Sequence, residues 1–166
     1  MTNNKDRSVQ ADCIKVLYEI GERKPALIAD YGKKFVALLE SKDNRLVWGA
    51  MTALDTIALG NPNSIYAALS KIIQVADAGT VITKDHGVNI LIKLASIRKY
   101  RDNAFSLFID QLKSCPTNQL PMYAERAIPV INDENKAVFV KTLASRLDAL
   151  KETKRKRVEK VIRKVS

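Results

Sequence analysis

The feature that most constrains this chain is a repeat of 37 residues. In the run from Val9 to Gly21, apolar residues recur at helical spacing, and shifts of one, two and three repeat lengths reach similar runs beginning at Leu46, Thr83 and Leu120. Three columns align through the four copies: Cys13, Ala50, Gly87 and Ala124; Leu17, Leu54, Leu91 and Ile128; Ile20, Ile57, Leu94 and Ile131. A helix pair of this length cannot bury its apolar stripe alone, so we expect neighbouring pairs to stack around a continuous core.

Second helices are expected between these runs. We predict them over residues 26–39, 65–75 and 104–112, with a fourth beginning near Asn135. Pro25 opens the first of them, because a proline is tolerated where the amide has no helical acceptor. Pro129 lies inside the expected fourth repeat helix and should kink or shorten it.

The segment from Phe35 to Leu46, followed by Ala50 and Leu54, resembles the HEAT repeat of the armadillo-like superfamily. In that family an outer helix ends in a Leu-Leu pair, an Asp follows in the turn, and an inner helix carries a branched residue, an Ala and a Leu. The resemblance covers roughly residues 5–147 and implies an all-α fold, a right-handed α-α superhelix of about four helix pairs. We predict a single domain over residues 1–166, closed by a basic capping helix over residues 151–166. The family's inner-helix arginine is replaced by Gln10, Val47, Lys84 and Pro121, so we expect its Asp–Arg ladder to be lost.

Composition limits the classes of protein to consider. With 46% hydrophobic and 28% charged residues the chain is typical of a soluble globular protein, and it has neither a spanning segment nor a signal peptide. Two cysteines, Cys13 and Cys115, supply no disulfide framework and no C-x-x-C metal site. We therefore expect a cytoplasmic protein with no cofactor, no metal and no membrane partner, in which Cys13 is an inert core residue.

If the resemblance holds, the inner helices line a concave surface. Their exposed positions include the only Trp and the only His of the chain, among polar and charged residues, a mixture enriched at protein-binding hot spots. The predicted protein-binding residues are Trp48, Asp55, Asp85, His86, Asn89, Tyr123 and Arg126. Two structural alternatives stay open: Trp48 packed between neighbouring inner helices, and His86 as an ordinary packing or surface residue.

The sequence contains no motif of a known catalytic site. It has no glycine-rich phosphate loop, no G-x-S-x-G and no H-E-x-x-H, and the adjacent Asp85 and His86 point about 100° apart on a helix. The architecture is similar to that of the HEAT-like alkylpurine DNA glycosylases, but those enzymes place an aromatic residue and a carboxylate on one inner helix, whereas Thr52 follows Trp48 by one turn. We therefore expect a protein that is not an enzyme.

Charge supports an alternative function. The net charge is +10, of which +6 falls in residues 151–166 and +4 in the rest. Nucleic-acid binding would use the last helix, through Arg155, Arg157, Lys160, Arg163 and Lys164, together with Lys15 and Arg126 of the concave surface. In a third interpretation, compatible with either, the helix is only a cap, with Val158, Val161 or Ile162, and Val165 as its apolar stripe.

Overall fold

A computed structural model describes residues 6–166 of the chain. Over that range it has ten α-helices and no strand, which confirms the all-α prediction. The chain divides into two compact units, Met1–Leu94 and Ala95–Ser166, which we call the first and the second unit and describe separately. The right-handed superhelix concerns the whole chain and stays a prediction.

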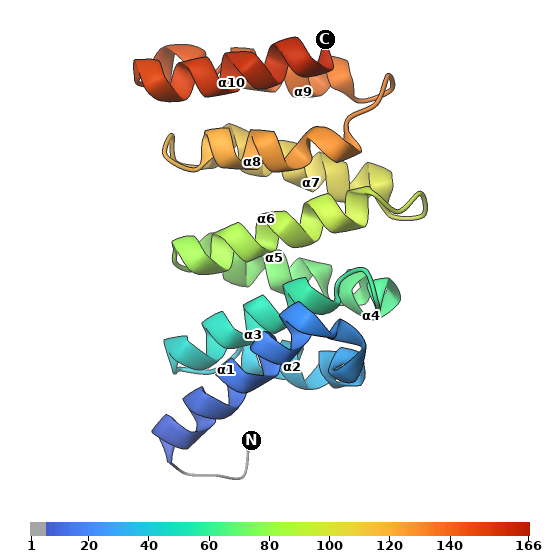
Figure 1. The fold of residues 1–166 in the computed structure, drawn as a ribbon, viewed down its shortest axis with the longest axis vertical. Helices are drawn as coiled ribbons and strands as arrows, with labels where there is room; N and C mark the ends of the chain where they lie inside the picture. Colours follow the sequence, from blue (N-terminus) through green and yellow to red (C-terminus); the bar gives the residue numbers. More distant parts are fainter. Residues whose placement is uncertain (1–5) are drawn as a thin grey trace. The chain divides into compact units, whose positions relative to one another are not determined.

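The first unit contains six of the helices. They are α1 (Arg7–Arg23), α2 (Gly32–Leu38), α3 (Asn44–Ile57), α4 (Pro62–Ala67), α5 (Leu69–Ala78) and α6 (Val81–Ala95), whose last residue belongs to the second unit. Figure 1 shows α3 and α6 nearer the viewer than α2 and α5. The helices α1, α3 and α6 are the three predicted inner helices, and each begins two residues before its predicted start.

Two of these helices begin in the same way. The side chain of Asp6 accepts a hydrogen bond from the amide of Ser8 at 2.8 Å, and that of Asp43 accepts one from the amide of Arg45 at 2.9 Å. Each aspartate thereby satisfies a first-turn amide that has no helical acceptor. The starts of α1 and α3 are thus set locally.

Residues of the repeat columns form the core in helices that have a neighbouring helix on both sides. Ala50, Leu54 and Ile57 of α3 are completely buried, and Gly87, Leu91 and Leu94 of α6 are buried as well. In α1 the same columns are less covered: Leu17 and Ile20 are half-buried, and Cys13 is exposed. The prediction that Cys13 is a core residue is therefore wrong, because Cys13 faces a hollow between α1 and α2 and not the contact of α1 with α3.

The outer helices depart further from the prediction. The expected helix over residues 26–39 is two 3₁₀ turns, Pro25–Leu27 and Ala29–Tyr31, followed by the short α2. These turns carry Ile28 into the core, where it is 2% exposed and lies against Gly21. The helix expected over residues 65–75 is divided into α4 and α5 at Ala68.

The second unit contains α7 (Arg101–Ser114), α8 (Leu120–Ala127), α9 (Lys136–Ala144) and α10 (Glu152–Val165). As predicted, Pro129 shortens the fourth inner helix: α8 ends at Ala127 and a 3₁₀ turn, Ile128–Val130, follows. In that turn Ile128 leaves the buried column and is half-buried.

Candidate functional site

A hollow of about 310 Å³ crosses the inner helices of the first unit. It is lined by Ala11, Asp12, Ile14, Lys15 and Tyr18 of α1, by Arg45, Trp48, Gly49 and Thr52 of α3, and by Ile82 of α6. We call it the inner groove. It lies on the row of helices for which the sequence predicted a binding surface.

A close approach of α1 to α3 forms the floor of the inner groove. A Cβ atom built on Gly49 would lie 2.5 Å from Cγ1 and 2.8 Å from Cγ2 of Ile14. Real Cβ atoms do not come so close, so only a glycine lets the two helices meet here. The sequence repeat places this glycine one residue after Trp48.

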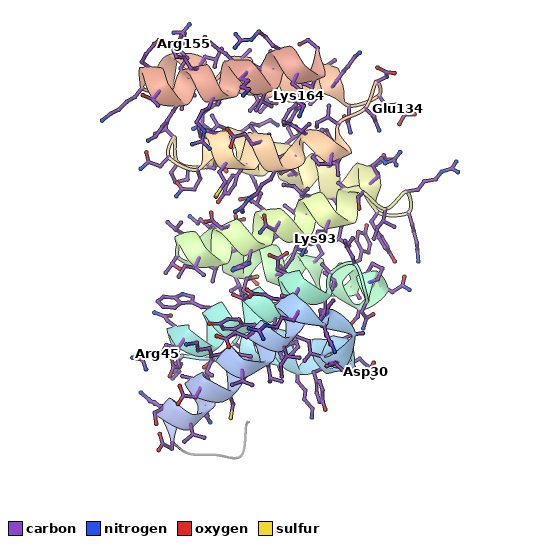
Figure 2. All side chains as sticks on the ribbon, in the orientation of Figure 1. Asp30, Arg45, Lys93, Glu134, Arg155 and Lys164 are labelled. Carbon is purple, nitrogen blue, oxygen red and sulfur yellow. The ribbon has the colours of Figure 1, made fainter. Side chains whose placement is uncertain are left out.

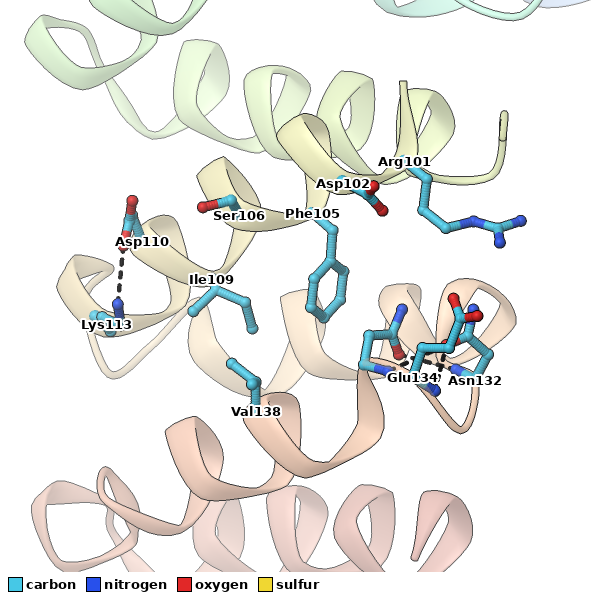
Figure 3. A pocket seen from close by; sticks show the side chains of 11 residues that line it. Arg101, Asp102, Phe105, Ser106, Ile109, Asp110, Lys113, Asn132, Glu134 and Val138 are labelled. Carbon is cyan, nitrogen blue, oxygen red and sulfur yellow. Dashed lines mark hydrogen bonds and ion pairs between the residues drawn. The ribbon is translucent and has the colours of Figure 1, made fainter. Parts of the chain in front are cut away.

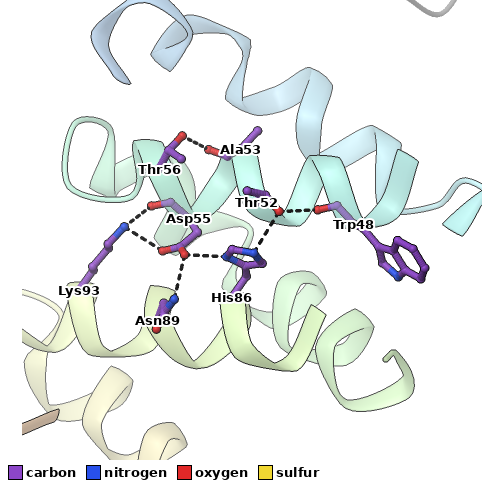
Figure 4. A network of polar contacts seen from close by, with 8 residues as sticks. All are labelled: Trp48, Thr52, Ala53, Asp55, Thr56, His86, Asn89 and Lys93. Carbon is purple, nitrogen blue, oxygen red and sulfur yellow. Dashed lines mark hydrogen bonds and ion pairs between the residues drawn. The ribbon is translucent and has the colours of Figure 1, made fainter. Parts of the chain in front are cut away.

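Trp48 is half-buried in the wall of the inner groove. In Figure 4 its indole points away from the polar side chains that join α3 to α6. Tyr18 is also half-buried, and Ile82 is 43% exposed. An aromatic ring, a tyrosine and an exposed isoleucine thus border one hollow, with Lys15 and Arg45 exposed beside them.

A cluster of polar side chains centred on the carboxylate of Asp55 lies next to the groove. His86 Nδ1 is 2.8 Å from Asp55 Oδ2, Asn89 donates to the same oxygen at 3.1 Å, and Lys93 Nζ is 2.8 Å from Oδ1 (Figure 4). His86, Asn89 and Lys93 recur at helical spacing on one face of α6. This Asp55 cluster ties α3 to α6.

Asp55 is ionised in this setting although it is only 6% exposed. Burial alone would raise its pKa, but the hydrogen bond from His86, the charge and hydrogen bond of Lys93 and the hydrogen bond from Asn89 together lower the pKa below its usual value. Lys93 also donates to the main-chain oxygen of Asp55 at 2.7 Å. The cluster therefore stabilises a buried negative charge.

Thr52 connects the Asp55 cluster to the groove wall. Its hydroxyl donates to the carbonyl of Trp48 at 2.9 Å and lies 3.0 Å from His86 Nε2. The order hydroxyl, imidazole and carboxylate is that of a catalytic triad. However, the single hydroxyl proton of Thr52 is held by the Trp48 carbonyl, and the charge of Asp55 is compensated by Lys93. These contacts favour a structural role for the cluster over nucleophilic chemistry.

The predicted protein-binding residues of the first unit lie in different surroundings. Trp48 lines the inner groove, whereas Asp55, His86 and Asn89 meet in the Asp55 cluster. Asp55 was expected to be exposed and is buried, since three side chains of α6 converge on it. Asp85, on the same helix, is half-buried.

The two remaining predicted residues belong to the second unit. Arg126 is exposed on α8, but Tyr123 is 1% exposed, so the prediction that it is a surface residue is wrong. The contacts of α8 with α7 and α10 account for this burial.

Three residues of the inner groove and the Asp55 cluster were not predicted from the sequence. Lys93 follows Asn89 by one helical turn and His86 by two, and this spacing could have placed it at Asp55. Arg45 and Ile82 of the inner groove lie outside the repeat columns and carried no signal.

A second hollow, of about 380 Å³, lies between α7 and α9 (Figure 3). Phe105, Ile109 and Val138 form its apolar side. Its charged residues have both signs, and Lys113 pairs with Asp110 at 2.9 Å. None of the predicted site residues lines it.

The basic helix α10 packs against α8 and α9 through Val158 and Val161, which are 0% and 2% exposed. Two of its arginines are paired with carboxylates: Arg157 donates to both oxygens of Glu125 at 2.8 and 2.7 Å, and Arg155 to Glu159 at 3.0 Å. Lys160, Arg163 and Lys164 are exposed; Figure 2 labels Arg155 and Lys164. The helix thus buries an apolar stripe against α8 and α9 and carries charged side chains on its outer face.

Within residues 6–166, His, Cys, Asp and Glu side chains form no group of three or more that could hold a metal ion. No helix in this range has the length and hydrophobicity required to cross a membrane.

Neither a protein-family model nor a curated protein matches the chain.

Proposed function

We propose that this chain is a non-catalytic protein-interaction module, a short HEAT-like solenoid whose inner groove binds a peptide or a helix of a partner protein. The observation that carries the proposal is the hollow of about 310 Å³ in which Trp48 lies beside Tyr18 and Ile82. Half-buried aromatic side chains in a hollow bind apolar anchors of a partner at low cost in conformational entropy.

The charges of the groove define the partner further. Arg45 and Lys15 are exposed at its border, and Lys15 pairs with Glu19 at 3.9 Å. A ligand with an apolar side chain for the Trp48 wall and a carboxylate for Arg45 would satisfy both kinds of contact.

A peptide library displayed on phage tests this proposal. Peptides are selected on the full chain alone, and the binding of each labelled peptide to the wild-type chain and to Trp48→Ala is compared by fluorescence polarisation. Because Trp48 is the only tryptophan, its own fluorescence also reports binding to the wild-type chain. We expect Trp48→Ala to weaken binding by at least about tenfold and to shift the melting temperature little.

Leu59→Ala is the matched control, since Leu59 is 55% exposed and lies outside the inner groove. It should leave binding unchanged. Peptides that bind the wild-type chain and Trp48→Ala equally well would refute the proposal. A large loss of melting temperature in Trp48→Ala would instead assign Trp48 to packing.

A second candidate function is nucleic-acid binding by α10, supported by the exposed Lys160, Arg163 and Lys164. Removing the helix would uncover the core around Val158, so substitution is the better test. We would measure fluorescence polarisation of labelled duplex and single-stranded DNA at several salt concentrations. If these three cations contact phosphates of the duplex, replacing all three by Gln should reduce the slope of log K against log salt by about 3. Absence of binding at low salt excludes this function.

A further inference from the structure

The first unit has another hollow, between α1 and the segment that leads into and through α2. It measures about 590 Å³ and is lined by Val9, Asp12, Cys13, Val16 and Leu17 of α1, and by Tyr31, Lys34, Phe35 and Leu38 of the segment leading into and through α2. We call it the α1–α2 groove. Its border is apolar, since Val9, Val16 and Tyr31 are 39%, 55% and 44% exposed.

The repeat shows what such a surface packs against elsewhere in this chain. Cys13 and Leu17 occupy the columns that Ala50 and Leu54 occupy in α3. In α3 both positions are completely buried, and α1 is a main packing neighbour of that helix. The surface of α1 is therefore of the kind that another helix pair of the same sequence type covers.

The charges at the α1–α2 groove are complementary to themselves. Asp12 lies on α1 and Lys34 on α2, both exposed, and the Lys34 ammonium lies over the ring of Tyr31. A two-fold axis through the groove would bring Asp12 of one copy to Lys34 of the other, and the reverse, because in an isologous interface each contact occurs twice.

We infer that a second copy of this chain covers the α1–α2 groove in an isologous dimer, with Val16 of each copy inserted into the groove of the other. The outer face of α10 cannot take this place as a head-to-tail partner. It carries exposed cations, including Lys160 and Arg163, where an apolar groove requires an apolar surface.

Sedimentation velocity of the full chain from about 1 to 300 µM tests the inference. The wild-type chain should move from monomer to dimer over this range. Val16→Glu should raise the dissociation constant at least about tenfold without lowering the melting temperature, because the side chain is exposed. Val138→Glu is the matched control, since Val138 of α9 is 52% exposed and lies outside the groove.

A charge exchange tests the two-fold geometry. Asp12→Lys alone and Lys34→Asp alone should each stay monomeric, because each places like charges opposite one another. An equimolar mixture of the two variants should form a heterodimer, because both contacts then join opposite charges. Asp12 also borders the inner groove, so the readout is molecular mass and not peptide binding.

Three results would overturn the inference: a wild-type monomer at every concentration, a dimer that Val16→Glu leaves unchanged, or a mixture of charge variants that stays monomeric. Circular dichroism spectra and melting curves of all variants show whether they are folded.

Discussion

Each unit joins neighbouring helices through a carboxylate and cations about one repeat further along the chain. In the first unit, buried Asp55 of α3 meets His86 and Lys93 of α6, which lie 31 and 38 residues further on. In the second, Glu125 of α8 meets Arg157 of α10, 32 residues away, with both side chains more than a third exposed. A buried carboxylate needs several partners to offset its lost hydration, whereas an exposed one needs a single arginine and water.

The units also differ in what holds the end of a helix. In the second unit the guanidinium of Arg146 donates to the carbonyl oxygens of Leu112 and Cys115 at 2.7 and 2.8 Å, and also to that of Lys113. These carbonyls stand at the C-terminal end of α7, where a cation is favoured. The second unit thus relies on an arginine distant in the sequence and on the packing of α10, whereas the first relies on the buried repeat columns of α3 and α6.

The largest expected effect concerns those columns. Leu54→Ala and Leu91→Ala should each lower the free energy of unfolding by about 2–5 kcal/mol, because both side chains are 0% exposed and their loss leaves a cavity. Cys13→Ala, in the small column of the first repeat, should cost less than about 0.5 kcal/mol since Cys13 is exposed. Urea denaturation measures all three. A cost for Leu54→Ala as small as that for Cys13→Ala would contradict the register.

The second largest loss of stability is expected at the Asp55 cluster. Asp55→Ala should cost about 2–3 kcal/mol, because it leaves Lys93 and His86, both only partly exposed, without their carboxylate. Thermal and urea denaturation of this variant, compared with Asp85→Ala on α6, measure the difference. An effect no larger than that of Asp85→Ala would show that the cluster does not fasten α3 to α6.

The glycine contact between α1 and α3 should have an intermediate effect. Gly49→Ala should cost about 1–3 kcal/mol, since the added carbon would displace Ile14. Gly60→Ala is the control: its Cβ would meet only the Ile57 carbonyl at 3.7 Å, and its φ is not positive. We expect the control to be neutral or slightly stabilising in the same denaturation experiment.

The pH dependence of stability isolates the ionisation of Asp55. The pKa of Asp55 is lower in the folded chain than in the unfolded chain, where it is near 3.8. The ionised carboxylate therefore stabilises the fold above that pH, and this stabilisation is lost as the pH falls through the folded pKa. The difference in stability between the wild type and Asp55→Asn should therefore narrow as the pH falls from about 6 to about 3. A difference that is constant over this range would contradict the assigned ionisation.

The smallest effect is expected at the exposed pair. Arg157→Ala should cost about 0.2–1 kcal/mol, because solvent screens its bidentate contact with Glu125. A double-mutant cycle with Glu125→Ala measures the coupling energy. A coupling as large as the cost of Asp55→Ala would remove the distinction between the two units.

Local patterns were sufficient to predict the inner helices. The columns of small and branched residues located α1, α3 and α6 to within two residues at their starts, and Pro129 correctly marked the shortened helix. The outer helices were harder, because Ile28 is drawn into the core and turns the chain into 3₁₀ geometry that its local sequence does not encode.

The candidate site was only partly predictable. Trp48 was found from its place on the inner face, but exposure was misjudged for Asp55 and Tyr123. Position along a helix says which way a side chain points, and burial depends on what a neighbouring helix places there.

The repeat in the sequence dictates helices, their order and the apolar faces that must be covered, since these follow from spacing along one chain. Three features arise only when helices meet: the convergence of His86, Asn89 and Lys93 on Asp55, the Ile14–Gly49 contact beneath the inner groove, and the α1–α2 groove. The first two depend on contacts between residues more than 30 positions apart, and the third on the packing of α1 beside α2, all of which side-chain packing sets and local propensity does not.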